Sequence, residues 1–164
     1  MKKRYVGVGL LIAFALIVIL IPLTSPLFKD DYSTIITDEA GQLLRVYLNK
    51  DDKYLFPIDI KKTIPPKLRI AALYFEDQYF KLHPGINPPS LIRAYFQNKK
   101  AGKIISGGST ITMQLARLAN PRPRTYINKL VEAIQALKIE LLYSKKEILS
   151  LYLNHAPYGS NIVG

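Results

Sequence analysis

The chain has 164 residues, enough for one domain with a modest hydrophobic core. It contains no cysteine and only two histidines, which excludes disulfides and structural metal sites built from these residue types. Its formal net charge is +11 at pH 7, as is typical of proteins that bind polyanions or an anionic membrane surface.

The N-terminus carries a candidate membrane anchor. Residues 1–4 contain three basic side chains, and Tyr5–Leu23 contains no charged residue. As a helix this apolar segment would span about 28 Å, close to the thickness of the hydrocarbon core of a bilayer. A cleavable signal peptide is the alternative, but its apolar region is shorter and ends in a small-x-small site. We expect a cytoplasmic tail over 1–4 and a transmembrane anchor over 5–23.

The basic residues before the anchor predict on which side of the membrane the domain lies. Such residues favour the cytoplasmic side, so the chain after about Thr24 is expected outside the cytoplasm. Nucleic acid is the usual partner of a basic domain, but a domain on the outer side rarely meets it. Lipid head groups and pyrophosphates are therefore the expected anionic partners, and nucleic acid is not.

Residues 24–60 predict a linker with short β strands. Thr34–Thr37, Leu43–Leu48 and Tyr54–Phe56 are rich in β-branched, aliphatic or aromatic residues, and turns rich in Asp, Asn or Gly separate them. We expect a small hairpin that joins the anchor to the body of the protein.

Residues 61–164 predict a mainly helical domain. The expected helices are Leu68–Phe80, Pro88–Asn98, Ser109–Leu118, Tyr126–Tyr143 and Lys145–Leu153, the last with a capping box of Ser144 and Glu147. In the fourth helix, apolar residues from Ile127 to Leu141 form a stripe that predicts its buried face. Lys129 and Glu132 lie away from this stripe, either as a surface ion pair or as an anion contact beside a second active carboxylate.

Acid–base chemistry is suggested by the segment that begins at Glu76. Glu76, Phe80 and His83 fall at positions i, i+4 and i+7, so they share one face if the helix continues that far. A carboxylate on an aromatic-lined face beside a cleft can serve as a general base. The alternative is a solvated Glu76–Asp77 pair at a helix end, capped by His83.

A Gly-Gly-Ser-Thr turn over residues 107–110 precedes the third helix. Free backbone N–H groups at a helix N-terminus point towards an anion, and glycines permit its close approach, so the turn predicts an anion cradle. Thr110, Gln114 and Arg117 recur at i, i+4 and i+7 and would present polar groups to a phosphate. The alternative is an ordinary capped amphipathic helix.

Four ordered segments resemble the motifs of the glycosyltransferase domain of class A penicillin-binding proteins, the peptidoglycan glycosyltransferases of family 51. The segments are Glu76–Gly85, Gly107–Leu115, Lys129–Glu132 and Lys145–Asn154. The resemblance implies a mainly α, lysozyme-like glycosyltransferase domain over 61–164, preceded by the small hairpin and one transmembrane helix. Because the chain stops after the fourth segment, the domain is expected to be incomplete at its C-terminus.

The resemblance also implies an activity and its setting. Lipid II would be added to a growing glycan strand through an inverting β-1,4 transfer, with release of undecaprenyl pyrophosphate. The protein would be single-pass in the bacterial inner (cytoplasmic) membrane, with its N-terminus in the cytoplasm and its domain on the periplasmic side. Membrane lipids and a transpeptidase or other cell-wall synthesis proteins are the further partners implied.

Residue roles follow from the same resemblance. Glu76 is the implied general base, and Glu132 a second catalytic carboxylate that orients the donor or helps to hold a divalent cation. That cation would be Mg²⁺ or Mn²⁺, and no organic cofactor is implied. The implied substrate-binding residues are Asp77, Phe80, His83, Ser109, Thr110, Gln114, Arg117 and Lys129.

Two positions depart from the family pattern. Arg117 stands where many members have Lys, which keeps the charge but changes its geometry, and Asn128 stands where Arg is usual. Two other functions remain open. One is a catalytically inactive truncated fragment that binds lipid II or partner proteins, and the other is a lysozyme-like hydrolase that uses Glu76 and Glu132 as an acid–base pair.

Overall fold

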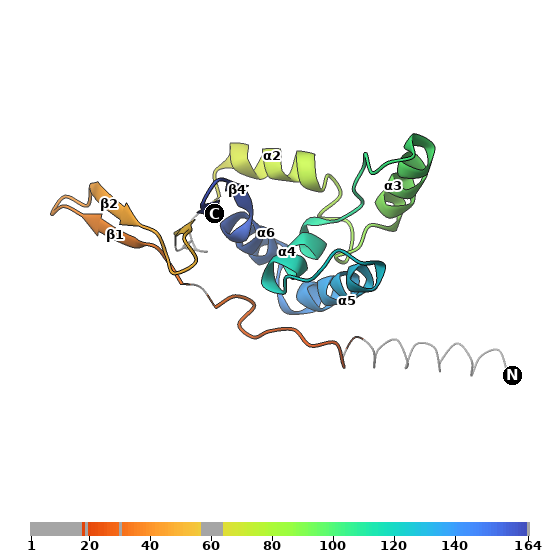
Figure 1. The fold of residues 1–164 in the computed structure, drawn as a ribbon, viewed down its shortest axis with the longest axis horizontal. Coiled ribbons are helices and arrows are strands. Elements are labelled where there is room, and N and C mark those ends of the chain that lie inside the picture. Colours follow the sequence, from red (N-terminus) through yellow and green to blue (C-terminus); the bar gives the residue numbers. More distant parts are fainter. Residues whose placement is uncertain (1–17, 19, 30, 57–63, 164) are drawn as a thin grey trace, which may run out of the picture.

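The computed structural model describes residues 18, 20–29, 31–56 and 64–163. Helices dominate this part of the chain, as predicted (Figure 1). They are α2 (Pro66–Glu76), α3 (Pro88–Ala101), α4 (Ile111–Ala119), α5 (Tyr126–Leu142) and α6 (Lys145–His155). The mainly α fold class is therefore confirmed, with differences at helix ends.

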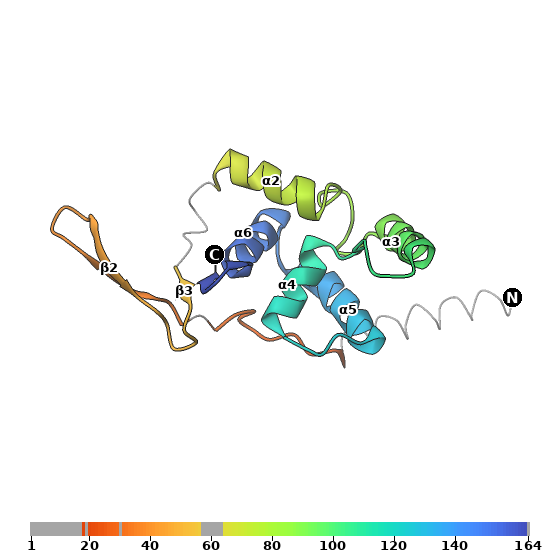
Figure 2. The same cartoon turned by 45° about the horizontal axis from the view of Figure 1, so that its top comes forward.

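The predicted hairpin is confirmed. Strands β1 (Thr34–Thr37) and β2 (Leu43–Tyr47) pair antiparallel. Asp38 stabilises their turn, because its carboxylate accepts the Gln42 backbone N–H at 2.7 Å. The hairpin extends away from the helices (Figures 1 and 2).

A second, three-stranded sheet closes the domain near α6. Strand β3 (Tyr54–Leu55) was predicted, and it runs parallel to β5 (Ile162–Val163), which also pairs antiparallel with β4 (Pro157–Gly159). The two C-terminal strands were not predicted, because segments of two or three residues are too short to show an alternating pattern. The sheet ties the segment after the hairpin to the end of α6.

The core lies around α4, which packs against α5 and α6 (Figure 2). Ile111 and Leu115 of α4 meet Ile139 of α5 and Ile148 of α6, and all four side chains are fully buried. Full burial of one such side chain stabilises the fold by about 1.5–3 kcal/mol. This cluster therefore fixes α4, the helix that carries residues of the second motif.

The predicted capping box at the start of α6 is confirmed. Ser144 Oγ accepts the Glu147 N–H at 3.3 Å, and the Glu147 carboxylate accepts the Ser144 N–H at 2.7 Å. The hydroxyl and amide of Ser144 together lower the pKa of Glu147. The box fixes where α6 begins.

Helix α2 ends earlier than predicted. The expected helix covered Leu68–Phe80, but α2 stops at Glu76, and Asp77 leaves the helical conformation with φ −162°. Phe80 and His83 therefore lie in a loop, and the prediction that they share a helix face with Glu76 is wrong. The reason is tertiary, because Asp77 turns its side chain towards His83 and the first amide of α4.

Helix α5 buries only the middle of the predicted stripe. Ile127 and Leu141, both in the expected buried stripe, are 76% and 79% exposed. Ile134 of the stripe is buried, and so are Glu132, Gln135 and Ile139, which the stripe did not include. Burial of the two polar side chains is possible because each has a hydrogen-bond partner inside the protein.

The predicted cytoplasmic tail and most of the predicted anchor over 5–23 lie outside the described residues. Within the described part of the chain, no helix combines the length and the apolar character needed to cross a bilayer. The described end of the anchor segment contacts α5. Lys138 Nζ donates to the Ile21 carbonyl at 2.7 Å, and Gln135 Nε2 donates to the Pro22 carbonyl at 2.9 Å.

Candidate active site

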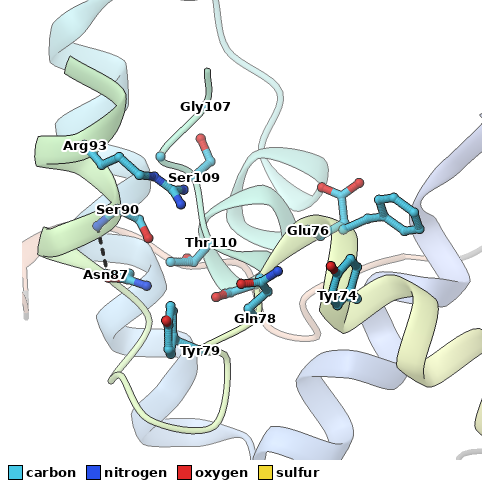
Figure 3. Close-up of a pocket in the computed structure, with 13 residues that line it drawn as sticks. Tyr74, Glu76, Gln78, Tyr79, Asn87, Ser90, Arg93, Gly107, Ser109 and Thr110 are labelled. Atoms are coloured by element: carbon cyan, nitrogen blue, oxygen red, sulfur yellow. Dashed lines mark hydrogen bonds between the residues drawn. The ribbon is translucent and has the colours of Figure 1, made fainter. Parts of the chain in front are cut away.

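A polar pocket of about 190 Å³ lies between the end of α2, the start of α3 and the loop before α4 (Figure 3). Tyr74 and Glu76 line it from α2, Arg93 from α3 and Ser109 from the loop. The pocket thus brings together a carboxylate, a guanidinium and a hydroxyl. These are groups that acid–base chemistry and anion binding require.

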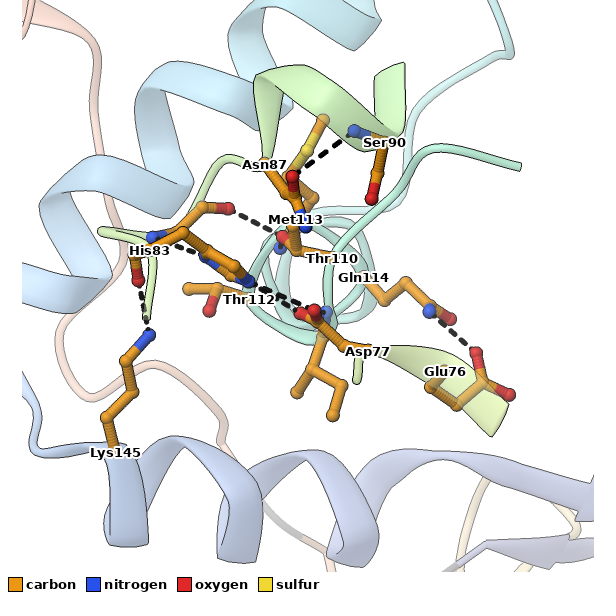
Figure 4. A network of polar contacts seen from close by, with 12 residues as sticks. Glu76, Asp77, His83, Asn87, Ser90, Thr110, Thr112, Met113, Gln114 and Lys145 are labelled. Carbon is orange, nitrogen blue, oxygen red and sulfur yellow. Dashed lines mark hydrogen bonds and ion pairs between the residues drawn. The ribbon is translucent and has the colours of Figure 1, made fainter. Parts of the chain in front are cut away.

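Glu76, the last residue of α2, has an exposed side chain at this pocket. Its Oε2 accepts a hydrogen bond of 2.8 Å from Gln114 Nε2 (Figure 4). The hydroxyl of Tyr152 on α6 donates in turn to Gln114 Oε1 at 3.4 Å. An accessible carboxylate held by a neutral donor can accept a proton from a hydroxyl placed in the pocket.

Asp77 is buried and ties the loop after α2 to α4 (Figure 4). Both its carboxylate oxygens lie 3.0 Å from His83 Nε2, and Oδ2 also accepts the Ile111 backbone N–H at 3.1 Å. Because the Gly85 N–H donates to His83 Nδ1, the imidazole carries its proton on Nε2, facing the carboxylate. This pair therefore fixes the chain next to Glu76.

The N-terminus of α4 is already occupied by groups of the chain itself. Thr110 is the N-cap, and its buried hydroxyl accepts the Met113 N–H at 3.1 Å and donates to the Gly85 carbonyl at 2.5 Å. The Ile111 N–H binds Asp77. The positive end of the helix dipole thus faces a carboxylate of the protein, where the sequence predicted an open anion cradle.

Lys129 links the loop before α4 to α5. Its Nζ donates to Ser109 Oγ at 2.6 Å and to Glu132 Oε2 at 2.8 Å. The Glu132 side chain is 8% exposed, whereas 36% of the Lys129 side chain remains exposed. The buried carboxylate holds the ammonium in place, and one of its three N–H donors remains for an anion.

Phe80 is a core residue. Its side chain is 2% exposed, and the Lys145 ammonium lies 4.4 Å from its ring centroid. Lys145 also donates to the His83 carbonyl and to the Glu140 carboxylate, both at 2.7 Å. Phe80 and His83 thus support the loop after Glu76 from inside, and their direct contact with substrate stays a prediction.

Arg117 lines a different space from Glu76. With Phe28 and Arg122 it borders a groove of about 680 Å³ beside the N-terminal segment. The helical face predicted for Gln114 and Arg117 therefore borders two spaces, since the Gln114 amide contacts Glu76 and Arg117 borders the second groove.

A protein metal site is not formed by the described residues. Among them, no three His, Cys, Asp or Glu side chains lie close enough together to hold an ion. Glu132, the expected ligand, is paired with Lys129, whose positive charge opposes a second cation beside it. A divalent ion held by Glu132 does not fit this arrangement.

A comparison with known protein families identifies the domain that carries this site. The family model described as transglycosylase matches residues 40–164, well over half of the chain. The chain belongs to the transglycosylase family. All four motif segments lie within the matched transglycosylase domain, so the family resemblance seen in the sequence is confirmed.

Individual relatives agree with this membership. The chain is 40% identical to penicillin-binding protein 1C of Escherichia coli (strain K12), over 85% of the chain and 18% of that protein. It is 38% identical to penicillin-binding protein 1A of Aquifex aeolicus (strain VF5), over the whole chain and 24% of that protein. A biosynthetic peptidoglycan transglycosylase of Alcanivorax borkumensis is 45% identical over 59% of the chain and 40% of that protein. The chain thus spans less than half the length of each.

Sequence reasoning assigned no role to three residues of this candidate site. Arg93 lines the Glu76 pocket, Tyr152 contacts Gln114, and Lys145 binds the loop after Glu76. Tyr152 and Lys145 belong to the fourth motif segment, so that segment was the signal that could have found them. The partner of Tyr152 lies 38 residues away along the chain and that of Lys145 lies 62 residues away, so only the fold reveals these contacts.

Proposed function

We propose that this chain is a membrane-anchored peptidoglycan glycosyltransferase that polymerises lipid II into β-1,4-linked glycan strands and releases undecaprenyl pyrophosphate. Membership of the transglycosylase family supports this function. The observation that carries it is the exposed Glu76 carboxylate, bound by Gln114 in a pocket that also contains Arg93. A pyrophosphate leaving group needs positive charge more than a proton, so one carboxylate base beside cations suits this reaction.

Glu76 acts as the general base. It takes the proton of the 4-hydroxyl of the acceptor GlcNAc while that oxygen attacks C1 of the donor MurNAc. The bond from C1 to the pyrophosphate oxygen breaks, its electron pair leaves with undecaprenyl pyrophosphate, and the configuration at C1 inverts. Because Gln114 occupies Oε2, the other carboxylate oxygen is available to the acceptor hydroxyl.

Lys129, Arg117 and Arg93 supply positive charge for the pyrophosphates of donor and acceptor. Two of the three N–H donors of Lys129 bind groups inside the protein, and the third is available to a phosphate oxygen. Glu132 acts through Lys129, because its buried carboxylate holds that ammonium. This pairing argues against a hydrolase in which Glu76 and Glu132 form an acid–base pair.

The cellular setting is part of the same proposal. The protein is anchored once in the bacterial inner membrane, with its N-terminus in the cytoplasm and its domain on the periplasmic side. Its partners are membrane lipids, the growing glycan strand, and a transpeptidase or other cell-wall synthesis protein. A divalent cation, Mg²⁺ or Mn²⁺, would enter with the substrate's pyrophosphate, because Glu132 is already paired with Lys129.

The test is incubation of the chain in detergent with labelled lipid II, with Mg²⁺ or with a chelator, and separation of the products on a gel. A ladder of glycan strands supports the function, and its loss in the chelator supports the cation. Binding of lipid II without a ladder would identify a binding fragment. In a parallel incubation with finished glycan in place of lipid II, cleavage of that glycan would identify a hydrolase.

A further inference from the structure

Gln114 connects the proposed base to a tyrosine on another helix. Its Nε2 donates to Glu76 Oε2 at 2.8 Å, and its Oε1 accepts from the Tyr152 hydroxyl at 3.4 Å. The three residues come from α2, α4 and α6. We call Tyr152, Gln114 and Glu76 the relay. Its two hydrogen bonds link α6 to the carboxylate at the end of α2.

The orientation of the Gln114 amide decides what Glu76 contacts. With Nε2 towards Glu76, the amide donates a hydrogen bond to the carboxylate. With the amide rotated by half a turn, Oε1 would face the carboxylate, and two acceptors would repel each other. Tyr152 favours the first orientation, because its hydroxyl gives Oε1 a donor on the opposite side.

Tyr152 is held so that this donor stays in place. Its side chain is 7% exposed and packs in the main hydrophobic cluster, which prevents the ring from turning away. Burial raises the pKa of Tyr152 to about 12, and the charges of Glu76 and Tyr158 act in the same direction, whereas Arg117 lowers it. The hydroxyl therefore keeps its proton at neutral pH and can donate it to Gln114.

We propose that Tyr152 is a positioning residue for glycosyl transfer, because its hydroxyl holds the Gln114 amide with Nε2 towards Glu76 and so orients the base. This inference rests on the proposed function, in which Glu76 takes the acceptor proton. Tyr152 is not among the residues that line the Glu76 pocket. Its loss is therefore expected to slow the reaction and leave substrate binding unchanged.

The kinetic test compares Tyr152→Phe with Tyr158→Phe in lipid II polymerisation. Loss of one orienting hydrogen bond should lower kcat about five- to tenfold in Tyr152→Phe and leave KM within about twofold. Tyr158→Phe is the matched control, because the Tyr158 hydroxyl donates to the Leu153 carbonyl and not to Gln114; we expect no change in either constant. An unchanged kcat in Tyr152→Phe would overturn the inference.

A double variant tests whether the two residues act as one unit. Adding Tyr152→Phe to Gln114→Met should not lower kcat any further, because both changes break the same relay. Additive losses would show that Tyr152 acts elsewhere.

A second readout does not depend on turnover. The side-chain amide resonances of Gln114, assigned by their disappearance in Gln114→Met, should shift in Glu76→Gln. In the Tyr152→Phe background this response should be largely lost, and an equal response in both backgrounds would overturn the inference. If the unmodified chain makes no polymer, the proposed function fails, and the amide resonances still decide whether the relay exists.

Discussion

Asp77 and His83 form a buried pair in which both carboxylate oxygens lie 3.0 Å from the imidazole Nε2. Their side chains are 3% and 8% exposed, so hydrogen bonds inside the protein must replace the lost water. The Ile111 N–H supplies a further donor at the start of α4. Because Glu76 directly precedes Asp77, the place of the proposed base depends on this pair.

Asp77→Asn should therefore destabilise the fold. The substitution removes the negative charge that faces the α4 N-terminus, and it leaves an amide group where His83 requires an acceptor. We therefore expect a loss of about 2–3 kcal/mol in the free energy of unfolding. Asp38→Asn is the control, since Asp38 is exposed and accepts one backbone N–H, and it should cost less than about 1 kcal/mol. Denaturant unfolding measures both. Equal losses would contradict the buried pair.

Gly85→Ala should be more damaging than Gly102→Ala. Gly85 has φ +93°, and a Cβ there would lie 2.9 Å from the Ala136 carbonyl oxygen and from Glu140 Cγ. Backbone strain and steric overlap together should lower the free energy of unfolding by about 3 kcal/mol. Gly102 has φ +64° but no atom within 4 Å of its added Cβ, so strain alone should cost about 1 kcal/mol. Thermal unfolding of the two variants compares them, and similar midpoints would contradict this reading.

The hairpin and the order of the helices could be predicted because short-range patterns determine them. The turn at Asp38 and the capping box of Ser144 and Glu147 are local devices, and the structure shows both. The end of α2 could not be predicted, because the partners of Asp77 include a backbone amide 34 residues away. A helical pattern has no information about such a partner.

The buried face of α5 could also not be predicted fully from the sequence pattern. Apolar spacing favoured the stripe from Ile127 to Leu141, but only its middle is buried, together with Glu132 and Gln135, whose polar groups have hydrogen-bond partners inside the protein. In the candidate site, the motif segments predicted roles for Glu76 and Lys129, and these roles stay predictions. They did not show that Lys129 uses Glu132 and Ser109 as partners, which only the packing of α5 on the loop reveals.

Lys129→Met should separate stability from activity. It leaves the buried Glu132 carboxylate without its cation, which we expect to cost about 3–5 kcal/mol. Adding Glu132→Leu removes the unpaired charge and should restore most of the stability. The double variant should still fail to polymerise lipid II, because the cation for the pyrophosphate is absent. Polymerisation by the double variant at the unmodified rate would show that the pair is purely structural.

Stability should fall at alkaline pH through Tyr152. Burial raises the pKa of Tyr152 to about 12 from its ordinary value of 10.0, so between these values the folded state binds the proton that the unfolded state releases. The stabilisation is complete below pH 10 and is lost as pH rises towards 12. In Tyr152→Phe this part of the decline should be missing. Parallel pH profiles of the free energy of unfolding would contradict the shift.

The most direct test of the account is the rate of lipid II polymerisation by Glu76→Gln, measured with its affinity for lipid II in the same preparation. Glu39→Gln, at an exposed position in the hairpin turn, is the control. Loss of a general base predicts a decrease of at least about 100-fold in the rate of Glu76→Gln, with affinity within about threefold and no change in the control. Polymerisation by Glu76→Gln at the rate of the unmodified chain would contradict the assignment of Glu76 as the base.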